Sequence, residues 1–301
     1  SRETISVQPL FNQPPARDRP TQHCQYQTNP PPHPLFLNMK RNATTSTTHL
    51  PDAKKQKTTN TTTNHLTIGV LALQGAFREH VEHLKQMDNV AVCEIRNASE
   101  LLGLDGLVIP GGESTAIAKI ATRFGAASDD GLFARLQDWI ATEQKPIWGT
   151  CAGLIFLANK IVGGEKTGGQ PLIGGLDVEV SRNYFGKQIK SFEAEIEPPP
   201  TLSTLSRHDD DDDDNVGQEL DAAAPPTTYT GVFIRAPAIL ATGAGVRTLS
   251  SVVSTSGATV AVAVEQGHLL ATAFHPELTE DARWHEYFVR KCRTVQQKAV
   301  E

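Results

Sequence analysis

Short apolar segments alternate with amphipathic ones along most of this chain, from Leu66 to about Arg293. The first apolar run, LTIGVLAL, is too short for a buried helix and ends at a Gln-Gly pair, so it predicts a buried strand. Strands alternating with helices across short loops favour a mainly parallel sheet covered by helices on both faces. The pattern predicts strands at 66–73, 90–95, 107–109 and 147–148, and helices at 76–87, 114–124, 132–143 and 154–158.

The second half of the chain has a different pattern, with closely spaced strands and few helices. Gln266-Gly267 lies between two apolar runs and predicts a hairpin turn. Residues 241–257 are rich in Gly, Ser, Thr and Ala and predict no definite element. The pattern indicates strands at 176–180, 192–195, 231–234, 259–265 and 268–274, followed by a helix at 281–298. The expected fold class is therefore α/β.

Composition divides the chain into a leader, one domain and a short tail. Residues 1–65 are rich in Pro, Thr and Asn and contain few large apolar residues, which predicts a disordered leader. The folded domain is expected at 66–296, with a surface insertion at about 198–228 and a tail at 297–301. The insertion carries the acidic run Asp209–Asp214. A solvated loop explains this run better than a calcium site, because the spacing and turn glycine of an EF-hand loop are missing.

Charge and hydropathy argue against nucleic-acid and membrane binding. The net charge is −6, and no apolar run approaches the roughly 18 residues of a membrane span. A cytoplasmic location is expected. However, the basic clusters Lys40-Arg41 and Lys54–Lys57 have the spacing of a bipartite nuclear-import signal, with an ordinary basic stretch as the alternative. Met39, just before the first cluster, is a candidate start of translation.

The four cysteines give no sign of a metal centre. Cys24, Cys93, Cys151 and Cys292 are widely scattered and form no Cys-x-x-Cys pair. Neither a zinc site nor a disulfide framework is indicated, and a reducing compartment fits this usage. No metal ion or organic cofactor is expected.

One of these cysteines lies where an apolar strand turns into an apolar helix. Residues 149–153 read Gly-Thr-Cys-Ala-Gly, the pattern of a nucleophile elbow. Such a turn exposes the Cys151 thiol and brings it near a helix N-terminus, which favours a thiolate. An isolated cysteine would more often be a small buried residue. The flanking glycines and the pair described next favour catalysis.

A base and its orienting group follow 124 positions after Cys151. In His275-Pro276-Glu277, the imidazole is placed to take up the thiol proton and the carboxylate to hold the ring. The backbone N–H groups of Ala152 and Gly112 are candidate oxyanion donors. An ordinary turn is the alternative for Pro110-Gly111-Gly112. The other histidines on predicted helices, His80, His83 and His285, are expected to be solvated.

These motifs, in this order, resemble the class I glutamine amidotransferases, and specifically the glutaminase subunits of pyridoxal 5′-phosphate synthases. The resemblance spans about Leu66 to Arg290 and implies a flavodoxin-like sheet with a cysteine elbow. Its motifs are IGVLALQGA at 68–76, REH at 78–80, PGGEST at 110–115, GTCAGL at 149–154, RN at 182–183, FG at 185–186, SFEA at 191–194, TGVFIRAP at 230–237 and FHPELTED at 274–281.

The resemblance also implies roles for individual residues and a partner. Cys151, His275 and Glu277 would form the triad of a glutaminase that releases ammonia through a thioester. The ammonia would pass to a separate (β/α)8-barrel synthase subunit. We expect L-glutamine to be held by six residues: Gly112, Glu113, Ser114, Arg182, Ile234 and Arg235. An arginine and a carboxylate complement the α-carboxylate and α-ammonium of glutamine.

Three alternatives remain at this point. The chain could serve another acceptor synthase, such as one in a histidine or nucleotide pathway. It could be a non-catalytic regulatory subunit of the same fold, although the intact Cys-His-Glu set opposes this. A cysteine peptidase with a related elbow is disfavoured by the arginines that match a glutamine site.

Overall fold

The computed structural model describes residues 65–123, 131–162, 170–182, 184, 191–200, 227–254 and 257–298, all within one compact unit. The expected leader apart from its last residue, the two basic clusters, the acidic run and most of the insertion at 198–228 lie outside the described residues. So do residues 299–301 of the expected tail. No described helix is both long and apolar enough to cross a membrane.

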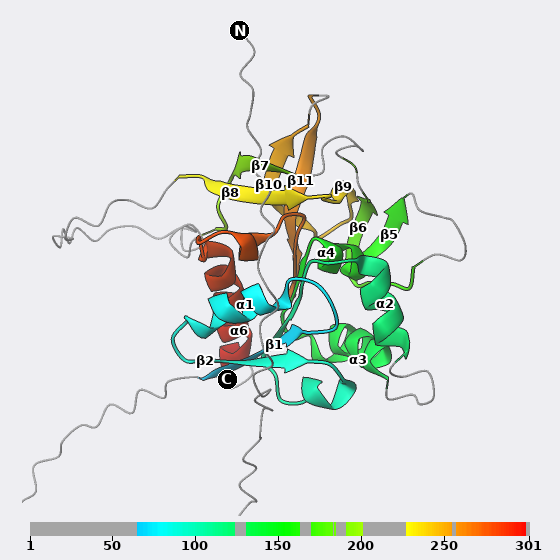
Figure 1. Ribbon diagram of the computed structural model, residues 1–301, viewed down its shortest axis with the longest axis vertical. Coiled ribbons are helices and arrows are strands. Elements are labelled where there is room, and N and C mark those ends of the chain that lie inside the picture. The colour runs from blue at the N-terminus through cyan, green and yellow to red at the C-terminus, as the bar shows by residue number, and fades with distance from the viewer. Residues whose placement is uncertain are drawn as a thin grey trace, which may run out of the picture. The chain divides into compact units, whose positions relative to one another are not determined.

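Five parallel strands form one half of the main sheet (Figure 1). Their order is β2-β1-β3-β4-β12, so the last strand of the chain is inserted beside the strand that precedes Cys151. The apolar runs therefore form the parallel sheet that they predict. The strands are β1 (Leu66–Leu71), β2 (Val90–Ile95), β3 (Gly106–Ile109), β4 (Ile147–Thr150) and β12 (Leu269–Thr272).

Helices cover both faces of this parallel half. Figure 1 shows α1 and α6 on one side of the strands and α2, α3 and α4 on the other. The predicted helix at 132–143 is confirmed, but its last five residues widen into a π-helix, Trp139–Glu143. The helices are α1 (Phe77–Lys85), α2 (Ser114–Arg123), α3 (Leu132–Asp138), α4 (Ala152–Leu157) and α6 (Arg283–Lys298), with short 3-10 turns η1 (Ala98–Leu101) and η3 (Pro276–Leu278).

Strands that pair mostly antiparallel extend the sheet beyond β12, and of those described only β5 pairs parallel, with β6. The hairpin at Gln266-Gly267 is confirmed, since β11 (Thr259–Gln266) pairs antiparallel with β12. The sheet continues through β9 (Ala238–Thr242) and β6 (Leu176–Ser181) to β5 (Ala158–Val162), and β10 (Arg247–Val253) also pairs with β11. A separate antiparallel pair consists of β7 (Ser191–Ile196) and β8 (Tyr229–Ile234). The sequence pattern missed β5, β9 and β10.

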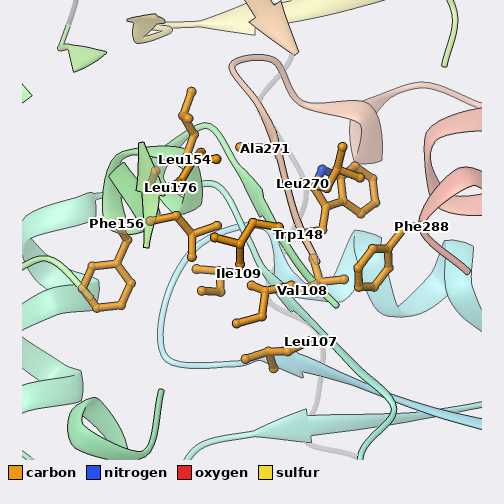
Figure 2. Packing of buried hydrophobic residues seen from close by; sticks show 14 of the residues in the cluster. Leu107, Val108, Ile109, Trp148, Leu154, Phe156, Leu176, Leu270, Ala271 and Phe288 are labelled. Atoms are coloured by element: carbon orange, nitrogen blue, oxygen red, sulfur yellow. The ribbon is translucent and has the colours of Figure 1, made fainter. Parts of the chain in front are cut away.

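The core lies on both faces of β3 and β4, whose residues are all buried. Figure 2 shows Phe156 of α4 and Phe288 of α6 on opposite sides of these strands. Trp148 is fully buried on the α6 side, with its ring centroid 5.7 Å from that of Phe288. Successive side chains of a strand point to opposite faces of the sheet. The position of Trp148 on the α6 side therefore fixes the orientation of β4 and of the residues at its carboxyl end.

The described cysteines differ in their bonding. Cys151 and Cys292 are buried free thiols. Cys93 is disulfide-bonded, so the expectation of no disulfide was wrong for this residue. Its wide spacing from the other cysteines gave no indication of a pairing.

Candidate active site

Cys151 occupies a strained turn between β4 and α4. Its backbone has φ 46° and ψ −95°, a conformation that a residue with a side chain rarely adopts. The two flanking glycines permit it. A Cβ on Gly149 would lie 2.5 Å from the Gly153 carbonyl carbon, and one on Gly153 would lie 2.1 Å from the Ile109 oxygen. The Gly-Thr-Cys-Ala-Gly pattern is therefore a steric requirement of this turn.

Strand pairing brings the His-Pro-Glu segment to the same place. Thr272 of β12 lies beside Thr150 of β4, and the N–H of Cys151 donates to the Thr272 carbonyl at 2.8 Å. The segment starting at His275 follows directly. The His275 N–H donates to the Val232 carbonyl of β8 at 2.8 Å, which anchors the backbone before η3.

The imidazole of His275 lies between Cys151 and Glu277. Its Nδ1 is 2.8 Å from Glu277 Oε1, and the ring also hydrogen-bonds the side chain of Cys151. Burial lowers the pKa of His275, but the hydrogen bonds and negative charge of Cys151 and Glu277 outweigh burial and raise it to about 10. His275 is thus favoured in its protonated, imidazolium form at neutral pH.

Glu277 is buried behind His275, with 4% of its surface exposed. Burial raises the pKa of this carboxyl, but the nearby His80 and the hydrogen bond from His275 oppose burial, and the net result is a lowered pKa. A carboxylate therefore orients the ring through Nδ1 and leaves Nε2 for the sulfur.

The Gly111-Gly112 turn lies against the triad because neither residue has a side chain. A Cβ on Gly111 would lie 2.4 Å from His275 Cε1. Neither glycine has a positive φ, so close approach to neighbouring atoms is what requires them. The Gly111 carbonyl accepts from the Ala76 N–H at 3.1 Å. The Gly111 C=O and the Gly112 N–H belong to the same trans peptide and point in opposite directions. The Gly112 N–H therefore points away from Ala76.

One cavity of about 300 Å³ joins nearly all the residues singled out from the sequence. Glu277 is the exception, since it lies behind His275 and does not line the cavity. The sequence did not single out Ile155 or Gln74 as site residues. The cavity is lined by Gln74, Gly112, Glu113, Ser114, Cys151, Ala152, Ile155, Arg182, Ile234, Arg235 and His275.

Gln170 joins two of the predicted glutamine-binding residues. Its Oε1 accepts from Ser114 Oγ at 2.9 Å and from the guanidinium of Arg182. Gln170 Nε2 and Arg182 Nε are buried and have no hydrogen-bond partner among the described residues. Gln170 itself does not line the cavity, so its contribution is to hold Ser114 and Arg182 in place. A lone glutamine in a Gly-rich stretch gave no signal of this in the sequence.

Glu113 and Arg235 are held by local backbone features. The Glu113 carboxylate accepts from the N–H groups of Thr115 at 3.1 Å and Ala116 at 2.7 Å, so it caps α2. Arg235 has φ 46° at the end of β8, and the preceding Ile234 carbonyl lies 4.0 Å from the Cys151 sulfur. The end of β8 therefore forms one wall of the site.

The expectation of solvated histidines was wrong for His80 and His285. Both are fully buried, and His83 is partly buried. α6 covers the face of α1 that a helical pattern alone would leave open, and the His83 and His285 rings stack at 4.5 Å. Within the part of the chain that the structure describes, no group of three or more His, Cys, Asp or Glu residues is arranged to hold a metal ion.

Comparison with known proteins identifies relatives over most of the chain. Residues 70–294 match the model of the SNO glutamine amidotransferase family. The "Probable pyridoxal 5'-phosphate synthase subunit PDX2" of Arabidopsis thaliana is 46% identical over 253 residues, covering 78% of this chain and 89% of that protein. The "Pyridoxal 5'-phosphate synthase subunit PdxT" of Dehalococcoides mccartyi is 43% identical over 227 residues, covering 75% and 97%.

A solved structure supports the same fold. The structure titled "Crystal structure of glutamine amidotransferase" is 38% identical and superposes with a TM-score of 0.58. It covers 75% of this chain and 98% of that chain.

Proposed function

Because the chain belongs to the SNO glutamine amidotransferase family, we propose that it is the glutaminase subunit of a pyridoxal 5′-phosphate synthase. It hydrolyses L-glutamine to glutamate and ammonia. The observation that carries this proposal is the Cys151–His275–Glu277 arrangement at a ligand-sized cavity, which Cys151 and His275 line. The relatives named as synthase subunits support the pathway.

The first half-reaction forms a thioester and releases ammonia. The Cys151 thiolate attacks the side-chain amide carbon of glutamine, and a C–S bond forms as the carbonyl electrons move to oxygen. The N–H groups of Gly112 and Ala152 stabilise this oxyanion. The His275 imidazolium then donates its proton to the amide nitrogen, the C–N bond breaks, and ammonia leaves.

The second half-reaction restores the enzyme. His275, now neutral, removes a proton from water, which attacks the thioester carbon. The C–S bond breaks, glutamate leaves and the thiolate returns beside the imidazolium. Glu277 keeps the ring in one orientation through both steps, since its hydrogen bond to Nδ1 is 2.8 Å long.

Glutamine is held by charge complementarity in this proposal. The Arg182 guanidinium lines the cavity together with Ser114 and suits the α-carboxylate. Glu113 faces the same cavity and suits the α-ammonium. Gly112, Ile234 and Arg235 complete the walls around the side-chain amide.

The partner is a (β/α)8-barrel synthase subunit that receives the ammonia. The names of the relatives as synthase subunits support this assignment. No metal or organic cofactor enters the glutaminase steps, which need only the thiol, the imidazole and backbone donors. The competing assignment, a glutaminase for another acceptor synthase, shares the same site and differs in its partner alone.

The direct test is ammonia release from glutamine by the purified chain, alone and with a barrel synthase subunit. We expect release that the synthase stimulates, and pyridoxal 5′-phosphate formation when its sugar phosphates are supplied. Release that no barrel subunit affects would assign the chain to another pathway. Absence of release under every condition would leave the non-catalytic subunit as the better description.

Activity should decline at high pH as His275 loses its proton. The imidazolium is retained below its pKa of about 10 and is lost as pH rises through that value. We expect the alkaline limb of kcat/KM near pH 10, and a shift to lower pH in Glu277→Gln, because the carboxylate helps to raise the His275 pKa. pH–rate profiles of the parent, of Glu277→Gln and of the control His83→Gln measure the position of this alkaline limb. An identical alkaline limb in Glu277→Gln would contradict the assigned pairing.

A further inference from the structure

The second oxygen of Glu277 is as buried as the first but lacks an assigned role. Oε1 faces His275, whereas Oε2 has no partner in hydrogen-bond geometry among the described residues. Its nearest charged or chargeable neighbour is His80 Nε2, at 3.3 Å. A buried carboxylate oxygen is costly unless an N–H or a positive charge faces it. His80 is thus the group in position to stabilise this oxygen.

The neighbours of His80 hold its ring in one place. The side chain is fully buried on α1, and its ring meets Trp148 edge-on with centroids 5.5 Å apart. Its Nδ1 lies 2.9 Å from His285 Nε2, and its Nε2 lies 3.2 Å from Thr150 Oγ1. α1, α6 and β4 together fix the imidazole opposite Glu277.

The hydrogen-bond partners also determine where the His80 proton lies. A carboxylate can only accept, so a favourable contact with Glu277 requires the proton on Nε2. Nδ1 is then an acceptor for the N–H of His285, whose own Nδ1 is left as an acceptor with no partner in the described part of the chain. In this arrangement the buried nitrogen without a partner is an acceptor, whereas the opposite arrangement would leave a buried N–H donor without a partner.

Burial and the neighbouring histidines favour a neutral His80 ring, whereas Glu277 favours a charged one. The titratable groups around the ring are Glu277 and His275 near η3, His83 on the same helix and His285 on α6. Burial lowers the pKa of His80 to about 4, because the opposing attraction of Glu277 is weaker and the other histidines add to the lowering. His80 therefore contributes an N–H dipole at neutral pH and not a full charge.

We propose that His80 is a positioning residue for the glutaminase reaction. Its Nε2–H fixes the second carboxylate oxygen of Glu277, and Glu277 in turn holds His275 toward Cys151. This inference rests on the proposed function. It extends the series of close polar contacts from the cavity to α1 and α6, as His285–His80–Glu277–His275–Cys151, with the His80–Glu277 link at 3.3 Å.

Two amide substitutions separate this role from simple packing. The glutamine amide nitrogen reaches the place of histidine Nε2, whereas that of asparagine reaches the place of Nδ1. We expect His80→Gln to retain kcat within about threefold of the parent, and His80→Asn and His80→Phe to lose about tenfold with KM unchanged. The matched control His83→Gln, one turn along α1, should leave kcat unchanged. Equal losses in Gln and Asn variants would overturn the proposal.

A double-mutant cycle tests whether His80 acts through Glu277. We expect His80→Phe to cost about tenfold in the parent and less than about twofold in a Glu277→Gln background. Equal losses in both backgrounds would assign His80 a role independent of Glu277 and refute the proposal. All proteins are compared as complexes with the barrel synthase, and thermal unfolding identifies any variant that fails to fold.

A measurement on the enzyme without substrate tests this proposal independently of the proposed function. Histidine ¹⁵N NMR of the intact chain follows the titration of His275 without turnover. We expect His80→Phe to lower the pKa of His275 and His80→Gln to leave it near the parent value. An unchanged titration in His80→Phe would refute the positioning role, even if glutamine proved not to be the substrate.

Discussion

Cys151→Ala is expected to abolish glutamine hydrolysis. Loss of a catalytic nucleophile removes the covalent pathway, so kcat should fall by about 10⁴-fold or more while the fold is retained. Retention of the fold is expected because alanine keeps the Cβ in the same turn. Ammonia release with the barrel synthase present measures the effect, and circular dichroism with thermal unfolding verifies folding.

Cys292 provides the matched control for this result. It is also a buried free thiol, but it packs between α6 and β3, and burial raises its pKa. Cys292→Ala should therefore keep kcat within about twofold and lose about 1 kcal/mol of stability. Mass spectrometry of the quenched parent enzyme should find a glutamyl thioester on Cys151 alone. Residual activity in Cys151→Ala would remove the cysteine from the chemistry.

Gly153→Ala is expected to damage both stability and catalysis. Its Cβ would lie 2.1 Å from the Ile109 carbonyl oxygen, a backbone atom that cannot move without displacing β3. We expect a loss of about 3 kcal/mol in the free energy of unfolding. A displacement of about 1 Å in Cys151 should also lower kcat by about 10²-fold. Urea unfolding and ammonia release measure the two effects.

Gly267→Ala makes the same chemical change without the steric conflict. Gly267 lies at the β11–β12 turn with φ 56°, and nothing lies within 4 Å of an added Cβ. Only left-handed backbone strain opposes it, which costs about 1–2 kcal/mol. Full activity with a small stability loss is expected. Similar losses in both variants would mean that the elbow tolerates a side chain at Gly153.

The parallel half of the fold was predictable because its strands are continuous apolar runs. β5 and β10 were missed for the opposite reason. Ala158–Val162 continues an apolar helix and contains Asn and Lys, whereas Arg247–Val253 is rich in Ser and Thr. Their strand conformation depends on pairing with distant segments, such as β10 with β11, and local pattern carries little of that information.

The candidate site was predictable where chemistry constrains residue type. A thiol between two glycines and a His-x-Glu pair are distinctive at the level of sequence. His80 and Gln170 were not predictable, since their roles depend on what lies across from them. His80 belongs to a polar helical stretch, and only the packing of α6 and η3 shows that this stretch is buried.

The pairing of β12 with β4 has a consequence during synthesis of the protein on the ribosome. The thiol precedes its base by 124 residues, and the N–H of Cys151 is bonded to Thr272 in the finished sheet. A nascent chain that has emerged only through α4 holds the nucleophile but neither the imidazole nor the strand that aligns it. The Cys151 thiol therefore becomes reactive only when β12 is inserted between β4 and β11. Chains released from the ribosome before β12 is made should carry an ordinary, unactivated thiol.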